Sequence, residues 1–199
     1  MEAGLSAALA KYQPQAAILS SVIHHSPAIE QLLAERTYFI KLSHELKFPI
    51  KIAYEKPETL GVDRIALVCG AWSQFPGQHN LVIAVGSAIT YNFLDKNGQF
   101  LGGGISPGLD MRFKALHTFT DKLPYVAPDP QFPLIGYNTR QSILSGVQQG
   151  ALEEVDGMIT RYTERYGNFN VLLTGGIWNS LVLVLKIRYL QTLIWYIKA

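Results

Sequence analysis

The stretch of residues 81–116 constrains the fold more than any other part of this sequence. It opens with an unbroken apolar run, residues 81–85, that is too short for a typical globular helix and is rich in β-branched side chains. Such a run predicts a strand that is buried on both faces of a sheet. The dipeptide Gly86-Ser87 follows, and it places backbone that a ligand can approach closely beside a small hydroxyl group.

A hairpin and the start of a helix complete this stretch. A second strand is expected from Ile89, and residues 95–98, Asp-Lys-Asn-Gly, predict a tight turn because Asn and Gly tolerate positive φ. Residues 99–101 are expected to return antiparallel to that strand. We expect the glycines at 102–104 to end the returning strand and Ser106 to cap the helix that follows.

The residues before this stretch alternate between helix and strand, which is typical of an α/β protein. The apolar pattern predicts helices at residues 1–11 and 27–36, a buried strand at 16–22, and further strands at 38–42 and 50–54. A chain of 199 residues, of which 48% are hydrophobic and 16% charged, is long enough and apolar enough to bury a core. We therefore expect one or two globular domains.

The charge balance argues against nucleic acid and anionic membranes as partners. The chain has 17 basic and 15 acidic residues spread along its length, for a net charge of +2. The single cysteine, Cys69, cannot form an internal disulfide, and no signal peptide opens the chain, so we expect a cytoplasmic protein. Residues 181–197 are apolar, but Lys186, Arg188 and Gln191 interrupt them, so we expect no membrane helix there.

A second motif, Gly61-Val62-Asp63-Arg64, lies where a loop is expected to lead into a helix. Asp63 falls in the first turn, which leaves its carboxylate near the mouth of the loop, where it can accept a proton from a hydroxyl group. In the purely structural alternative, Asp63 interacts with the helix dipole and Arg64 lies in solvent. The planar guanidinium of Arg64 is also suited to pairing with the carboxylate of a substrate.

A third motif, Gly-Tyr-Asn-Thr at residues 136–139, leads into a helix that is expected to run to about residue 166. Asn138 and Thr139 are both of the residue types that commonly cap a helix. The acidic residues of this helix are expected to lie in solvent and to have no catalytic role: Glu153, Glu154 and Asp156.

Taken in order, these motifs resemble those of the type III pantothenate kinases. The longest matches are the eight residues from Gly86 and residues 100–112, and the resemblance covers roughly residues 16–176. It implies an α/β fold of the ribonuclease H-like type found in actin, Hsp70 and sugar kinases, with mixed sheets flanked by helices. Residues 1–75 would then be the remainder of an N-terminal α/β subdomain, and residues 76–199 a C-terminal α/β subdomain whose tail diverges from about residue 177.

The resemblance also implies an activity. The family transfers the γ-phosphoryl group of ATP to pantothenate, giving 4'-phosphopantothenate in the first step of coenzyme A biosynthesis, with Mg²⁺ bridging the ATP oxygens. By this resemblance Asp63 is the proton acceptor, and Ser87 contacts ATP. The remaining positions that match pantothenate-binding residues of the family are Tyr54, Gly61, Val62, Arg64 and Thr139.

The sequence departs from the family at two places. Nothing in it matches the Asp-x-Gly-Asn-Thr hairpin that binds ATP phosphates, so the first subdomain is expected to be truncated. Ala84 stands where the family carries an aspartate that ligates a monovalent cation, which puts a site for K⁺ or NH₄⁺ in question. Ser87 keeps the hydroxyl of the threonine that contacts ATP in the family.

Family members are homodimers with substrate sites near the interface, so the resemblance implies a homodimer. The alternative is a truncated non-catalytic homologue that binds pantothenate or a protein partner, as a regulatory accessory factor would. A third interpretation is an enzyme of the same fold that acts on another small hydroxylated substrate. The matches at Tyr54, at residues 61–64 and at Thr139 argue against this third interpretation.

Overall fold

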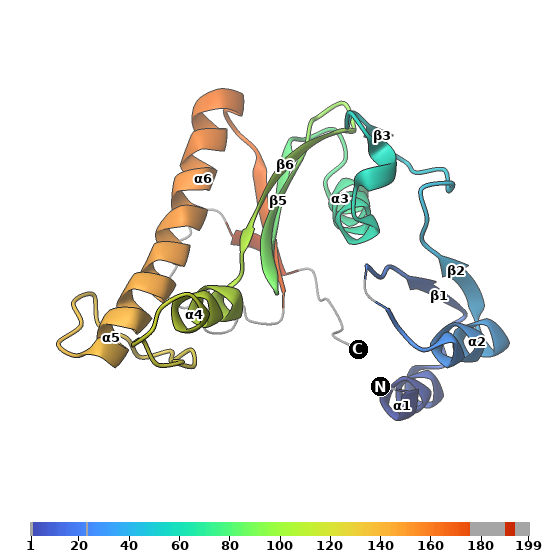
Figure 1. Cartoon of the computed structure of the whole chain (residues 1–199). Coiled ribbons are helices and arrows are strands. Elements are labelled where there is room, and N and C mark those ends of the chain that lie inside the picture. Colours follow the sequence, from blue (N-terminus) through green and yellow to red (C-terminus); the bar gives the residue numbers. More distant parts are fainter. Residues whose placement is uncertain (1, 23, 176–189, 194–199) are drawn as a thin grey trace.

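The computed structural model describes residues 2–22, 24–175 and 190–193, and over these residues the chain is a mixed α/β protein (Figure 1). Its strands form a two-stranded sheet, β1-β2, and a six-stranded sheet in the order β3-β6-β5-β4-β7-β8. The mixed sheet flanked by helices confirms the predicted α/β class. The divergent tail expected from about residue 177 lies outside the described residues except for 190–193.

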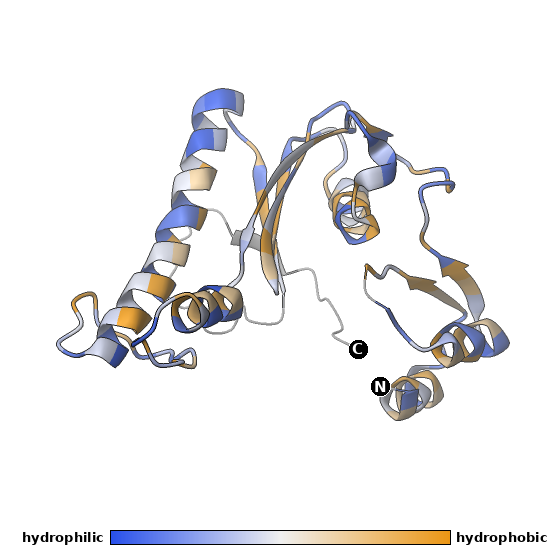
Figure 2. Cartoon of the chain, in the orientation of Figure 1, coloured by the Kyte–Doolittle hydropathy of each residue, from blue (hydrophilic) through white to orange (hydrophobic). Residues whose placement is uncertain are grey.

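The small sheet belongs to the N-terminal part of the chain. Helix α1 (Glu2–Tyr12) and helix α2 (Pro27–Arg36) pack beside two parallel strands, β1 (Ala16–Leu19) and β2 (Tyr38–Lys41). The strand predicted at 16–22 is therefore shorter than expected, and it is not buried, since Ile18 is 62% exposed. Figure 2 shows hydrophobic residues along β1 and β2, so the apolar pattern identified a strand but did not reveal that only one face is covered.

The central strands of the large sheet follow the prediction closely. Strand β4 (Asn80–Val85) is almost fully buried and pairs antiparallel with β5 (Ala88–Leu94), which pairs antiparallel with β6 (Gln99–Pro107). The predicted turn lies between β5 and β6, and its Gly98 has a φ of +73°. Three strands pair in parallel with their neighbours and complete the sheet: β3 (Lys51–Ile52) on β6, β7 (Asn170–Thr174) on β4, and β8 (Leu190–Leu193) on β7.

Strand β6 corrects two predictions about its end. The strand continues through the three glycines at 102–104 to Pro107, because Gly102 and Gly103 adopt φ values of +97° and +150° that let the strand bend without ending. Ser106 therefore lies in the strand and does not cap a helix. The residue that precedes helix α4 (Leu109–Thr118) as its N-cap is Gly108.

Helices cover the large sheet on both faces. Helix α3 (Val62–Gln74) follows a short 3₁₀ turn, Pro57–Thr59, and packs on β4 and β5 through a cluster that contains Val82 and Phe100. The opposite face carries α4, α5 (Thr139–Leu144) and α6 (Gly150–Tyr166), packed on Leu81 and Ile83. A π-helical turn, Ser145–Gln149, joins α5 to α6, so the helix predicted from 139 to 166 is nearly continuous. No helix among the described residues is long and apolar enough to cross a membrane.

Candidate active site

The loop before α3 places Asp63 as the sequence predicts. Gly61 is the N-cap of α3, and the half-buried Asp63 lies in the first helical turn. A Cβ atom on Gly61 would overlap Asp63 Oδ1, so the carboxylate folds back over the N-cap residue and any larger residue there would displace it. Val22 from the N-terminal part of the chain lies against the same position, 3.6 Å from where that Cβ would be. Asp63 thus sits at a junction of two parts of the chain and can accept a proton there.

Arg64 is buried beneath this loop, with 5% of its surface exposed. Its Nε donates to Asn92 Oδ1 at 2.6 Å and its Nη2 to the carbonyl oxygen of Tyr91 at 3.3 Å, and the guanidinium lies 5.8 Å from the centre of the Phe100 ring. The alternative in which Arg64 lies in solvent is therefore wrong. The helix turns this side chain toward the sheet, where an amide and a carbonyl on β5 satisfy it.

Asn92 is the residue of this face that the sequence analysis missed. Its amide nitrogen donates to the carbonyl of Val82 at 3.1 Å and to Thr90 Oγ1 at 3.0 Å, while its oxygen accepts from Arg64. Among the described residues no carboxylate pairs with Arg64. A buried cation held only by neutral acceptors leaves positive charge at this face of the sheet, which favours an anion nearby. The sequence signal that could have identified Asn92 was an amide side chain in a largely apolar strand.

Tyr54 lies at the same face, just after β3. Its ring packs on Gly102, where the edge atom Cε2 is 3.2 Å from the position that a Cβ atom would take. Tyr54 also packs against the hydrophobic cluster formed by α3 and the sheet. The structure therefore brings together Tyr54 and the segment 61–64, both of which the sequence singled out.

The turn between β4 and β5 presents Ser87 to solvent at one end of the sheet. Two other segments approach this turn closely. Gly108 donates its backbone N–H to the carbonyl of Ser87 at 3.0 Å, and a Cβ on Gly108 would overlap the carbonyl oxygen of Gly86. A Cβ on Gly175, at the end of β7, would likewise overlap the carbonyl oxygen of Val85. Glycine at 108 and 175 is what lets these backbones approach the turn that carries Ser87.

Ala84 occupies the rung next to this turn. It is paired with Thr90 of β5 and Thr174 of β7, and its methyl group offers no oxygen to a cation. Among the residues that the structure describes, no group of three or more His, Cys, Asp or Glu side chains is arranged to hold a metal ion. The residues present at this rung therefore do not fit a carboxylate-ligated K⁺ or NH₄⁺.

Thr139 lies on the other side of the sheet from Asp63. It is the exposed first residue of α5, and Asn138 is the N-cap, whose Oδ1 accepts from the N–H of Gln141 at 2.9 Å. The interpretation of Asn138 as a cap is thus confirmed. Because α5 packs in the cluster opposite to that of α3, one chain does not bring Thr139 to Asp63.

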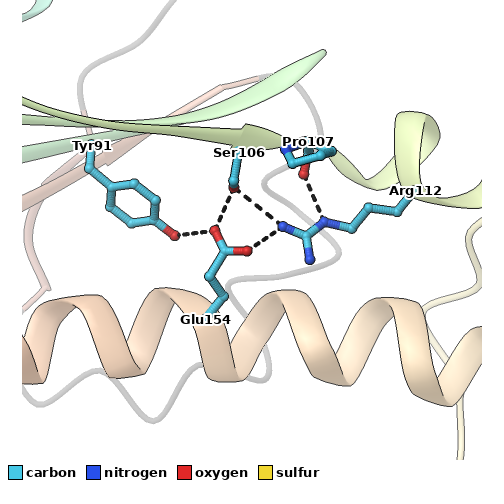
Figure 3. Close-up of polar contacts among 5 residues, drawn as sticks. All are labelled: Tyr91, Ser106, Pro107, Arg112 and Glu154. Carbon is cyan, nitrogen blue, oxygen red and sulfur yellow. Dashed lines mark hydrogen bonds and ion pairs between the residues drawn. The ribbon is translucent and has the colours of Figure 1, made fainter. Parts of the chain in front are cut away.

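A polar network between β5, β6, α4 and α6 corrects the prediction for Glu154 (Figure 3). This side chain is half-buried and does not lie free in solvent. It accepts from Tyr91 OH at 2.8 Å and from the Ser106 hydroxyl, and it forms an ion pair with Arg112. Arg112 also donates from Nε to the carbonyl of Pro107 at 2.7 Å. Four polar side chains from different elements therefore meet on the sheet face opposite to Arg64.

This network sets the protonation of its members. Burial alone would raise the pKa of Glu154, but the hydrogen bonds from Ser106, Arg112 and Tyr91 hold it below its ordinary value. Burial, together with the hydrogen bond to Glu154, raises the pKa of Tyr91, so the phenol stays a donor. Elsewhere, burial raises the pKa of the Cys69 thiol to about 11, which agrees with an inert thiol.

Comparison with known proteins gives a consistent match. The family model for type III pantothenate kinase matches residues 2–161. A type III pantothenate kinase from Flavobacterium johnsoniae is 47% identical over 134 residues, covering 67% of this chain and 55% of that protein. One from Phocaeicola vulgatus is 44% identical over 168 residues, covering 83% of this chain and 69% of that protein.

A solved structure supports the fold. The crystal structure of a conserved Baf family protein from Campylobacter jejuni matches with a TM-score of 0.51 and 24% identity, covering 80% of this chain and 68% of that one. At this identity the likeness concerns the fold alone. The chain spans 55% and 57% of the lengths of the relatives from F. johnsoniae and Cytophaga hutchinsonii.

Proposed function

The chain belongs to the type III pantothenate kinase family, and from this premise we propose that it transfers the γ-phosphoryl group of ATP to pantothenate. The product is 4'-phosphopantothenate, the first intermediate on the way to coenzyme A. The observation that carries the proposal is that Asp63 and Tyr54 lie on the same face of the sheet as Arg64, a buried cation with no acidic partner among the described residues.

The proposed role of Asp63 is that of the general base. It accepts the proton of the primary hydroxyl of pantothenate while that oxygen forms a bond to the γ-phosphorus of ATP. The bond between this phosphorus and the bridging oxygen breaks, and ADP leaves with the electron pair. The positive charge of Arg64 attracts the carboxylate of pantothenate to the same face, while Tyr54, Gly61 and Val62 shape the surface that receives it.

ATP is proposed to bind at the Ser87 turn. Ser87 is exposed, and other backbone segments approach its turn closely because Gly108 and Gly175 have no side chains. Magnesium enters as the complex with ATP, as part of the substrate, and neutralises phosphate charge. We propose no step that depends on a monovalent cation, because Ala84 offers no ligand.

The finer architecture is also part of the proposal. We assign the sheets to the ribonuclease H-like type, with residues 1–75 and 76–199 as two subdomains and with the cytoplasm as the compartment.

A homodimer is proposed because Thr139 and Asp63 lie over opposite faces of the sheet in one chain. A second copy would supply Thr139 to the pantothenate held near Asp63.

The substitution Asp63→Asn tests the proposed base. It keeps the shape of the side chain and removes the proton acceptor, so kcat for pantothenate phosphorylation should fall by about 100-fold to 10,000-fold. Pantothenate binding, measured by calorimetry, should persist. Unchanged turnover in this variant would rule out Asp63 as the base. A wild-type chain that binds pantothenate but never phosphorylates it would favour the non-catalytic homologue.

The matched control is Asp110→Asn. Asp110 also occupies the second position of a helix after a glycine N-cap and an apolar residue, as Asp63 does. Its carboxylate pairs with Lys114 at 2.7 Å and accepts from Tyr125 OH at 3.1 Å. This control should therefore leave kcat unchanged.

A further inference from the structure

A chain of contacts runs from α6 to the Ser87 turn. Glu154 pairs with Arg112, and Arg112 donates to the carbonyl of Pro107 at 2.7 Å. The next residue, Gly108, donates its N–H to the carbonyl of Ser87 at 3.0 Å. Each contact lies one step closer to the turn that is proposed to hold ATP, so the position of that turn depends on the carboxylate of Glu154.

The geometry of Glu154 argues for a role in positioning. Both carboxylate oxygens are occupied, since Oε1 accepts from Tyr91 and Ser106 while Oε2 accepts from Arg112. A carboxylate committed to three donors does not act as a base. A part-buried ion pair adds little stability over an apolar replacement. Its contribution here is therefore better explained by the positions that it imposes on Ser106 and Pro107.

The junction at residues 106–108 leaves little freedom for the Ser87 turn. Ser106 is held by Glu154 and also accepts from Arg112 Nη2 at 3.3 Å. Gly108 lies so close to the turn that a Cβ would overlap the backbone of Gly86. The pair on α4 and α6 therefore fixes one wall of the turn by backbone contact.

We propose that Glu154 and Arg112 are positioning residues for nucleotide binding, acting through the Pro107 carbonyl and the Gly108 N–H on the Ser87 turn. The inference rests on the proposed function, because it takes Ser87 as the contact to ATP. Loss of either side chain should loosen the turn and weaken ATP binding. Pantothenate binding should be spared, since the face that carries Asp63 and Arg64 lies across the sheet.

The experiment measures binding of Mg-ATP and of pantothenate to the whole chain by calorimetry, for wild type, Glu154→Gln and Arg112→Lys. Both variants should raise the Kd for Mg-ATP by about tenfold, the effect of losing one well-placed charged contact, and leave the Kd for pantothenate within about twofold. Arg112→Lys keeps the charge but loses the Nε–H bond to Pro107. It should therefore behave like Glu154→Gln.

The matched control is Glu153→Gln, the neighbouring exposed glutamate, which accepts a hydrogen bond from Gln149 Nε2 at 2.6 Å and lies outside the network around Glu154. It should bind both ligands as wild type does. Tyr91→Phe removes a donor to Glu154 without touching the junction, so it should weaken Mg-ATP binding less than Glu154→Gln does. This variant retains both charges of the ion pair, so it keeps the test usable if Glu154→Gln fails to fold.

Two results would overturn the inference while leaving the proposed function intact. One is wild-type affinity for Mg-ATP in a folded Glu154→Gln chain. The other is an equal loss of affinity for Mg-ATP and pantothenate, which a general loosening of the fold would cause. If the wild-type chain binds pantothenate but no Mg-ATP, the proposed kinase function fails, and the inference fails with it.

Discussion

The two faces of the large sheet each hold a buried or half-buried arginine, and they hold it in different ways. Neighbouring residues of β5 point to opposite faces, as the strand period requires. Asn92 receives Arg64 on the α3 face, while Tyr91 joins the carboxylate that binds Arg112 on the other face. Arg64 is 5% exposed and has neutral partners, whereas the side chain of Arg112 is 22% exposed and is ion-paired.

The difference lies in whether the charge of the arginine is neutralised by a carboxylate. On the α4–α6 face, Glu154 cancels the charge of Arg112, so the pair can fix geometry without attracting a ligand. On the α3 face, the charge of Arg64 has no acidic partner among the described residues, and Asp63 lies next to it in the chain. An anion is therefore favoured on the α3 face, where no described carboxylate pairs with Arg64.

The largest expected effect comes from Gly103→Ala, which disturbs both faces at once. Gly103 has a φ of +150°, and a Cβ there would overlap the carbonyl oxygen of Tyr91. This oxygen belongs to the peptide group between Tyr91 and Asn92. The strand must shift, so both arginine sites should move. We expect a loss of about 4 kcal/mol in the free energy of unfolding, measured with urea.

Gly104→Ala is the control for that substitution. Its Cβ would lie 3.3 Å from Cδ2 of the Tyr91 ring and would overlap no backbone atom, and its φ is not in the left-handed region. We expect a loss below about 1 kcal/mol. Equal losses of unfolding free energy in the two variants would show that overlap with the peptide group between Tyr91 and Asn92 is not what destabilises Gly103→Ala.

The next largest effect should come from Asn92→Ala. This substitution removes the acceptor of Arg64 Nε and leaves a charged donor unsatisfied in a buried site, at a cost of about 3 kcal/mol. Asn80→Ala is the matched control, because Asn80 is also fully buried but donates to neutral carbonyls of Phe75 and Gln78. It should cost less, about 1.5 kcal/mol. Similar losses would mean that the charge of Arg64 is satisfied elsewhere.

Local patterns were enough to predict the central strands, the turn at 95–98 and the start of α3. The apolar run at 81–85 could only be buried, and Gly98 supplies the φ that the turn needs. The segment 61–64 was found because a glycine before an aspartate in a first helical turn is a local signal. These features depend on residues that are close in sequence.

Contacts between distant residues could not be predicted in this way. Arg64 and Asn92 are 28 positions apart in the sequence, and Arg112 and Glu154 are 42 positions apart. Local spacing therefore cannot predict either pair. The glycines at 102–104 were expected to end β6 because the approach of Gly103 to the backbone of β5 is a tertiary contact. Ser106 and Glu154 were misassigned for the same reason.

A smaller effect is expected from Tyr91→Phe. The substitution keeps the packed ring and removes one of three donors to Glu154, so the chain should lose about 1.5 kcal/mol of unfolding free energy. Tyr162→Phe is the control, since that ring stacks on Phe93 at 5.1 Å and no hydrogen bond of its hydroxyl is part of the network. It should change stability by less than about 0.5 kcal/mol. An equal loss in both variants would show that removing a tyrosine hydroxyl lowers stability whether or not it donates to Glu154.

The smallest expected effect is the pH dependence of the Glu154 contribution. The folded-state pKa of Glu154 is lowered, so its stabilisation is fully present above the unfolded-state pKa of about 4.3 and is lost as the pH falls through the folded-state pKa. Wild type should exceed Glu154→Gln by about 1 kcal/mol at pH 7, because the pair is part-buried and partly screened, and this gap should close toward pH 3. Urea unfolding at several pH values measures it, with Glu153→Gln as the control for losing one surface charge. A gap that stays constant down to pH 3 would show that the contribution of Glu154 does not depend on its charge, and the two faces would then both stabilise their arginines through neutral hydrogen bonds.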